Sequence, residues 1–133
     1  MGAWGTGIFE DDTSLDLLAD AIESDAENFV RNASSKVNSD YLEYDEGQEI
    51  IVAGVILDAI LNKAKHRISD EEFQEWLSRQ ESKGLASFKE SILNGLGKVI
   101  SERSELNELW QENDEEYPRW RKNIEDLAAS LNS

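Results

Sequence analysis

Apolar residues recur at intervals of three and four along most of the chain, which is the spacing of one face of an α-helix. The first stripe begins after Asp12, runs through Leu18 and Phe29, and reaches the polar segment 32–39. Asp12 or Thr13 can cap its start, because either side chain can accept a hydrogen bond from the free N–H groups of the first turn. The pattern predicts a first helix that ends in a loop or a frayed end at residues 32–39.

The segment from about Glu46 to Lys65 is apolar on nearly every side rather than along one stripe. Its β-branched residues also make a β-strand possible over residues 50–56. The apolar run nevertheless continues to Ala64 without a turn signal, and this length favours a helix. Since a helix that is apolar all round is buried, we expect this to be the central helix. Gly54 is its weak point, unless another helix packs closely there.

Further helical patterns follow in the second half of the chain. Ser69 and Glu72 have the spacing of a capping box, which predicts the start of a short helix. The next helix is expected over residues 85–100, and a short helical turn and a last helix, which begins near Pro118, complete the chain. The sequence thus predicts an all-α fold, with a single all-helical domain over residues 1–133 built as a compact bundle of five to six helices around the central buried helix.

Acidic residues far outnumber basic ones: 29 Asp and Glu residues stand against 13 Lys and Arg residues, which gives a formal net charge of −16. Such a surface repels nucleic-acid phosphates and anionic lipids, so we expect neither a nucleic-acid nor a membrane partner. It attracts basic proteins and accelerates their association. No apolar stretch approaches the roughly 20 residues of a membrane span, and no signal peptide is visible, so we expect a cytoplasmic protein.

The opening stretch MGAWGTGIFEDD places glycines before a helix, an arrangement that can hold a phosphate on backbone N–H groups. Here carboxylates occupy the helix start and no lysine follows the glycines, so tight turning of the chain explains them better. The neighbouring carboxylates suit a hard cation chemically, but their spacing matches no calcium loop. We expect these carboxylates to cap the helix and face solvent; they belong to Glu10, Asp11, Asp12 and Asp16.

Residues suited to catalysis are few. The chain has no cysteine, and its single histidine, His66, lies among Lys and Arg residues at a helix end, where we expect it to be solvated. Glu71, Glu72 and Glu75 spell EExxE, with which all-helical nucleoside-triphosphate pyrophosphatases hold magnesium, but the candidate second element at residues 102–105 lacks the expected last residue. We expect no catalytic residue, no metal and no cofactor. A magnesium-dependent nucleotide hydrolase remains the enzyme alternative.

Three stretches resemble the family called domain of unknown function 4259. The run Gly2–Gly5, Phe9 and the acidic residues after it match the opening that is typical of this family. The stretch Tyr41–Glu43 and the stretch 104–110, followed by Trp120-Arg121, agree as well, so the resemblance spans nearly the whole chain. It implies a small, acidic, stand-alone bacterial protein without an established activity. That profile resembles immunity proteins, which neutralise toxins by tight complementary contact.

We therefore expect an acidic protein-binding module, an immunity-type inhibitor that occludes the active site of a basic toxin such as a nuclease. Loops carry function more often than helix faces. The expected partner contacts lie in one loop before the central helix and one late loop: Asp40, Glu43, Asp45 and Glu46, and Asp114, Glu115, Glu116 and Tyr117. Alone, the protein is expected to be a monomer or a weak homodimer. A homo-oligomeric regulatory protein is the remaining alternative.

Overall fold

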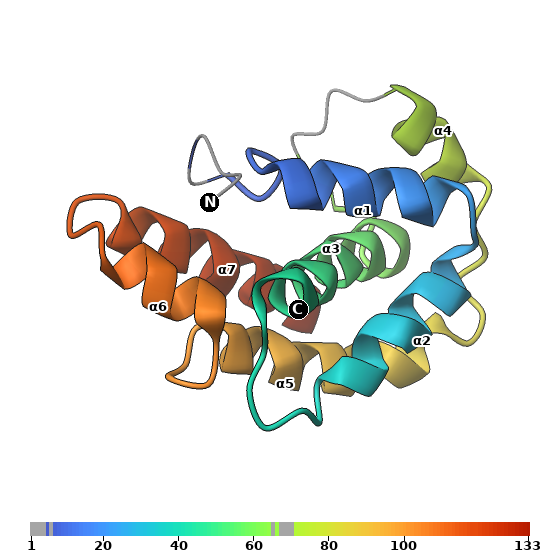
Figure 1. Ribbon diagram of the computed structural model, residues 1–133. Coiled ribbons are helices and arrows are strands. Elements are labelled where there is room, and N and C mark those ends of the chain that lie inside the picture. The colour runs from blue at the N-terminus through green and yellow to red at the C-terminus, as the bar shows by residue number, and fades with distance from the viewer. Residues whose placement is uncertain (1–4, 6, 65, 67–70) are drawn as a thin grey trace.

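The computed structural model describes residues 5, 7–64, 66 and 71–133, and within them the chain forms seven α-helices and one 3-10 turn (Figure 1). The elements are α1 (Asp12–Ile22), α2 (Ala26–Lys36), α3 (Tyr44–Leu61), α4 (Glu71–Ser78), η1 (Leu85–Phe88), α5 (Lys89–Val99), α6 (Glu105–Gln111) and α7 (Tyr117–Asn132). The all-α prediction is confirmed, although five to six helices were too few. No described helix is long and apolar enough to cross a lipid bilayer.

Helix α3 forms the centre of the fold, and twelve of its 18 residues are buried. Helices α1, α2, α5 and α7 pack around it (Figure 1). Gly54 lies where α5 and α7 approach α3 closely, since a Cβ atom there would lie 3.2 Å from Leu127 and 3.3 Å from Leu96. Because Gly54 has no side chain, other helices can pack closely against α3 at this point. This is the exception under which the sequence analysis did not expect Gly54 to weaken the helix. Helix α3 begins at Tyr44 and ends at Leu61, slightly before the predicted range.

The predicted first helix is two helices, which is the main reason that the predicted number was too low. Asp25 caps α2, because its side chain accepts a hydrogen bond from the backbone N–H of Asn28 at 2.8 Å. The carbonyl of Ser24, in the break, accepts a hydrogen bond from the indole of Trp76 at 3.1 Å. Helix α2 then continues to Lys36, into the segment that was predicted to be a loop.

The predicted helix over residues 85–100 is also divided. Gly84 has φ of 84°, a left-handed conformation that glycine adopts without strain, and it leads into η1 rather than directly into an α-helix. Helix α5 begins at Lys89 and buries Ile92, Leu96 and Val99 against the core. The predicted Ser69 cap lies outside the described residues, and the α4 helix that follows it begins at Glu71.

Candidate protein-binding surface

The segment before α3 is fixed against the start of α6 by backbone hydrogen bonds. The N–H of Leu42 donates to the carbonyl of Arg103 at 2.8 Å, and the N–H of Glu105 donates to the carbonyl of Leu42 at 2.9 Å. Leu42 itself is fully buried and anchors the segment in the core. These contacts place the exposed neighbour Tyr41 beside α6.

Tyr41 is one of two large apolar side chains that the described part of the chain exposes, with 39% of its surface accessible. Its hydroxyl donates a hydrogen bond to Oε2 of Glu108 at 2.9 Å, which holds the ring in place. Partial desolvation, the hydrogen bond to Glu108 and the charges of Glu108, Glu105 and Glu43 raise the pKa of Tyr41 to about 12. We call these four residues, Tyr41, Glu43, Glu105 and Glu108, the Tyr41 face.

The carboxylates of the Tyr41 face are held by neutral donors. Glu43 takes part in a capping box at the start of α3, where Glu46 accepts a hydrogen bond from the Glu43 N–H at 3.0 Å. Oε1 of Glu105 accepts a hydrogen bond from the Tyr44 N–H at 3.1 Å. Among the described residues, no carboxylate of this face forms an ion pair. The face is therefore ordered, and its negative charge is not neutralised locally.

The structure brings the first predicted loop to this face, where Asp40 and Asp45 are exposed and Glu46 is half-buried in the capping box. The second predicted loop lies at the opposite end of α6 (Figure 1). There Asp114 and Glu115 are exposed.

Two members of the second loop are engaged within the protein. Glu116 faces Arg119 across 3.5 Å. The hydroxyl of Tyr117 donates to Oδ1 of the buried Asn107 at 2.6 Å and accepts a hydrogen bond from Arg121 at 3.1 Å. Tyr117 therefore ties α6 to α7 and presents its hydroxyl to the interior of the protein rather than to a partner.

Sequence reasoning missed the acidic residues of α6. The spacing of Glu105 and Glu108 puts both on one side of a helix. Nothing in the sequence indicated that this side lies next to Tyr41, because the tyrosine and Glu108 are 67 residues apart. The periodicity of a helix identifies its faces but not its neighbours.

The residues of the magnesium alternative do not converge. Glu71, Glu72 and Glu75 are exposed on α4, whereas the segment 102–105 leads into α6 on the other side of the molecule (Figure 1). Within the described residues, no group of three or more His, Asp or Glu side chains is placed to hold a metal ion.

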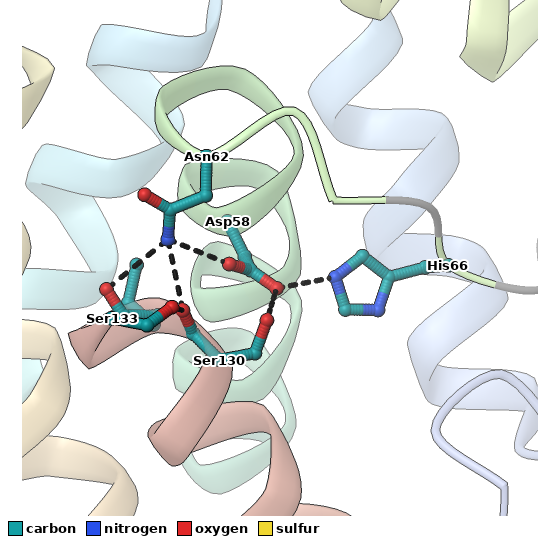
Figure 2. Close-up of polar contacts among 6 residues, drawn as sticks. Asp58, Asn62, His66, Ser130 and Ser133 are labelled. Carbon is teal, nitrogen blue, oxygen red and sulfur yellow. Dashed lines mark hydrogen bonds and ion pairs between the residues drawn. The ribbon is translucent and has the colours of Figure 1, made fainter.

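A buried polar cluster joins the C-terminal ends of α3 and α7 (Figure 2). Asp58 is fully buried, and its Oδ1 accepts a hydrogen bond from the amide of Asn62 at 2.9 Å. Its Oδ2 accepts from the hydroxyl of Ser130 at 2.7 Å and lies 2.9 Å from Nε2 of His66. The Asn62 amide also donates to the backbone carbonyls of Ser130 and Leu131. Three side chains, those of Asn62, Ser130 and His66, thus satisfy the Asp58 carboxylate, and the cluster fastens the end of the chain.

This cluster corrects the expectation for His66, whose side chain is 19% exposed and paired with Asp58 rather than solvated. In the sequence, only the basic neighbours of His66 are apparent, and they led to the expectation of a solvated side chain. A Ser, a His and an Asp do meet here, but Ser130 and His66 both bond to Asp58 (Figure 2). In a nucleophilic triad the histidine instead bonds the serine, in order to take its proton. The arrangement stabilises a buried carboxylate and does not activate Ser130.

The opening motif is partly structural. Asp11, rather than Asp12 or Thr13, caps α1, and its Oδ1 accepts a hydrogen bond from the Ser14 N–H at 3.1 Å. Glu10 folds back and accepts a hydrogen bond from the Gly7 N–H at 3.1 Å. Glu10, Asp12 and Asp16 are exposed, as expected, whereas Asp11, which was expected to face solvent, is buried because its carboxylate turns toward the N–H of Ser14 and the hydroxyl of Tyr44.

The profile of the family described as Domain of unknown function (DUF4259) matches residues 2–123, and the chain belongs to this family. No curated protein and no solved structure matched the chain.

Proposed function

We propose that this DUF4259 protein is an acidic protein-binding module of the immunity type, which neutralises a basic bacterial toxin, such as a nuclease, by occluding its active site. The observation that carries the proposal is the Tyr41 face: an ordered, exposed aromatic side chain surrounded by carboxylates that have no basic partner among the described residues. Tyrosines are enriched among the residues that dominate binding energy, because they bury a large area at a low entropic cost.

Charge supports the same proposal. A net charge of −16 draws a basic partner toward the molecule, and carboxylates at the contact replace the phosphates that such a partner's active site recognises. Within this proposal Tyr41 supplies affinity, and Glu43, Glu105 and Glu108 supply orientation and a fast association rate. Asp40 and Asp45 extend the negative charge around the face. The protein acts in the cytoplasm of the bacterium that makes it.

The test uses the protein encoded next to this chain's gene, because immunity proteins and their toxins are produced together. Binding is measured at several salt concentrations with wild type and with the double variant Glu43→Lys/Glu108→Lys. We expect the charge reversal to slow association by about tenfold at low salt, with the difference shrinking as salt is added. A neighbouring protein that does not bind the wild type contradicts the function.

The matched control is Glu71→Lys/Glu75→Lys, which makes the same change of charge at exposed positions of α4. It should slow association clearly less, since α4 lies away from the Tyr41 face (Figure 1). Equal slowing by both double variants would show that only the overall charge matters and would remove the Tyr41 face from the proposal. Tyr41→Ala should mainly accelerate dissociation, because truncating an interface anchor acts on the bound state.

A further inference from the structure

Tyr41 lies in the connection between α2 and α3, residues 37–43, which we call the Tyr41 segment. The second half of this segment is anchored by Leu42, which is buried and pairs with the backbone of residues 103–105. The first half has an anchor of its own. The backbone carbonyls of Val37 and Ser39 both accept a hydrogen bond from the ammonium group of Lys98, in the last turn of α5. Tyr41 is therefore placed between two anchors that come from different parts of the fold.

Helix α5 reaches the Tyr41 segment because it packs closely against the end of α2 (Figure 1). Val37 is the buried C-cap residue of α2, and a Cβ atom on Gly95 would lie 2.8 Å from its Cγ2 atom. Lys98 follows Gly95 by three residues, so the two share one side of α5. The Nζ atom of Lys98 lies 3.0 Å from the carbonyl oxygen of Val37. The close approach at Gly95 thus brings the ammonium group within reach of the carbonyls that follow α2.

The ammonium group of Lys98 is bound by the backbone rather than by a carboxylate. Carbonyl groups at the end of a helix lack partners within the helix and carry partial negative charge, so they favour a nearby cation. Acidic residues outnumber basic ones 29 to 13, yet Lys98 forms no ion pair with the described residues. The half-buried lysine is therefore placed to fix the course of the backbone just before Tyr41.

We propose that Lys98 is a positioning residue for the Tyr41 face: it holds the first half of the Tyr41 segment against α5 and so keeps Tyr41 on Glu108 in the free protein. An aromatic group that is held in place before binding loses less entropy in the complex, which raises affinity. The importance of Lys98 for binding rests on the proposed function. Its effect on the order of Tyr41 does not, and can be measured without a partner.

The decisive variant is Lys98→Met, which keeps an unbranched stem and removes the ammonium group. Backbone relaxation is measured by NMR on the full chain at neutral pH. We expect the order parameters of Asp40 and Tyr41 to fall from about 0.85, the value of rigid backbone, to below about 0.6. The nuclear Overhauser contact between the Tyr41 ring and the Glu108 side chain should weaken as well. Unchanged order parameters and an unchanged contact would overturn the proposal.

Two further variants separate positioning from general loosening. Lys36→Met removes an ammonium group in the last turn of α2 that pairs with Glu49, so it should leave the order of Tyr41 unchanged. Lys98→Arg retains a long stem, the charge and N–H donors, and should retain the order that Lys98→Met loses. Equal loss of order in Lys36→Met and Lys98→Met would overturn the specific role of Lys98.

A measurement on wild type requires no substitution and therefore does not depend on the folding of a variant. The ammonium signal of Lys98 should exchange slowly with water, because its protons are donated to two carbonyls. Lys83, which is exposed, is the control in the same spectrum and should exchange rapidly. Equal exchange rates for the two lysines would overturn the anchor.

The role in binding is tested with the protein encoded next to this chain's gene. Lys98→Met should accelerate dissociation about three- to tenfold, which corresponds to the cost of ordering one side chain on binding. The double variant Lys98→Met/Tyr41→Ala should dissociate no faster than Tyr41→Ala, because Lys98 acts through Tyr41. Fully additive effects would contradict positioning. A neighbouring protein that does not bind wild type would contradict the proposed function alone, since the NMR measurements decide the positioning role without it.

Discussion

Two regions of the molecule use carboxylates in opposite ways. In the cluster at the end of α3, Asp58 is fully buried, and an amide, a hydroxyl and an imidazole satisfy both of its oxygens (Figure 2). At the Tyr41 face, the carboxylates of Glu105 and Glu108 lie near solvent, and each accepts a hydrogen bond from a neutral group. The first region uses a charge to fasten two helices, whereas the second keeps its charges unneutralised.

The difference indicates which carboxylates serve folding and which serve association. A buried carboxylate must be fully satisfied, and removing it leaves its donors without partners. An exposed carboxylate contributes little to stability, and a large excess of like charge destabilises the compact state through repulsion. Beyond the hydrogen bonds that Glu43 and Glu105 accept at the start of α3, the unneutralised charges of the Tyr41 face therefore have no evident value for folding, which is consistent with a role in binding.

The largest effect is expected from Asp58→Ala. The substitution leaves a cavity and removes the acceptor for Ser130, Asn62 and His66, so we expect the free energy of unfolding to fall by about 3 kcal/mol. The measurement is urea unfolding at neutral pH. Asp45→Ala, at an exposed position of the same helix, is the control and should cost less than about 1 kcal/mol. Similar losses in both variants would contradict the contrast between buried and exposed carboxylates.

The same contrast between buried and exposed positions can be tested with two glycines of α5. A Cβ atom on Gly95 would lie 2.8 Å from Val37 and 2.9 Å from Ile50, so Gly95→Ala should destabilise the protein by about 1–3 kcal/mol. A Cβ atom on Gly97 would meet nothing within 4 Å. Because alanine favours the helix, Gly97→Ala should stabilise the protein by about 0.5–1 kcal/mol. Thermal unfolding of both variants checks the opposite signs, and a stabilising Gly95→Ala would contradict the packing of α5 on α3.

The sequence predicted the helices wherever apolar spacing was regular and failed where single polar contacts decide the structure. The burial of α3 followed from its lack of a polar face. The break between α1 and α2 did not follow from the apolar pattern. Nothing in that pattern distinguishes Asp25, which caps α2, from the other acidic residues around it. Asp58 likewise looks like one acid in an apolar run. Its partner His66 follows eight residues later, and Ser130 lies 72 residues away.

The candidate site was predictable only in part, for the same reason. The acidic segment before α3 was recognised from composition, and the structure leaves Asp40 exposed there. Asp45 and Glu46, predicted to lie in the same loop, lie in the first turn of α3, where Asp45 is exposed. The contribution of α6 was not recognised, because the pairing of Leu42 with the backbone of residues 103–105 joins segments that are distant in the chain. Local patterns carry no information about such contacts, which arise only when the helices pack.

The smallest effect on stability, and the most direct test of the Tyr41 face, is expected from Glu108→Gln. At neutral pH the substitution should change the free energy of unfolding by less than about 0.5 kcal/mol, because the site is exposed. It removes the charge beside the Tyr41 hydroxyl, so the pKa of Tyr41 should fall from about 12 while staying above the ordinary value of about 10, since partial desolvation remains. Alkaline titration of tyrosine absorbance, with Tyr41→Phe to identify the signal, measures this pKa.

The raised pKa of Tyr41 also sets the pH range in which the face affects stability. The folded protein holds the Tyr41 proton more tightly than the unfolded chain, so this contribution is fully present below about pH 10 and is lost as the pH rises through about 12. In Glu108→Gln the loss should end at a lower pH, because the folded and unfolded values lie closer together. A Tyr41 that titrates identically in wild type and Glu108→Gln would show that the carboxylate does not hold the ring. The Tyr41 face would then lose the ordered aromatic group that distinguishes it from the remaining acidic surface.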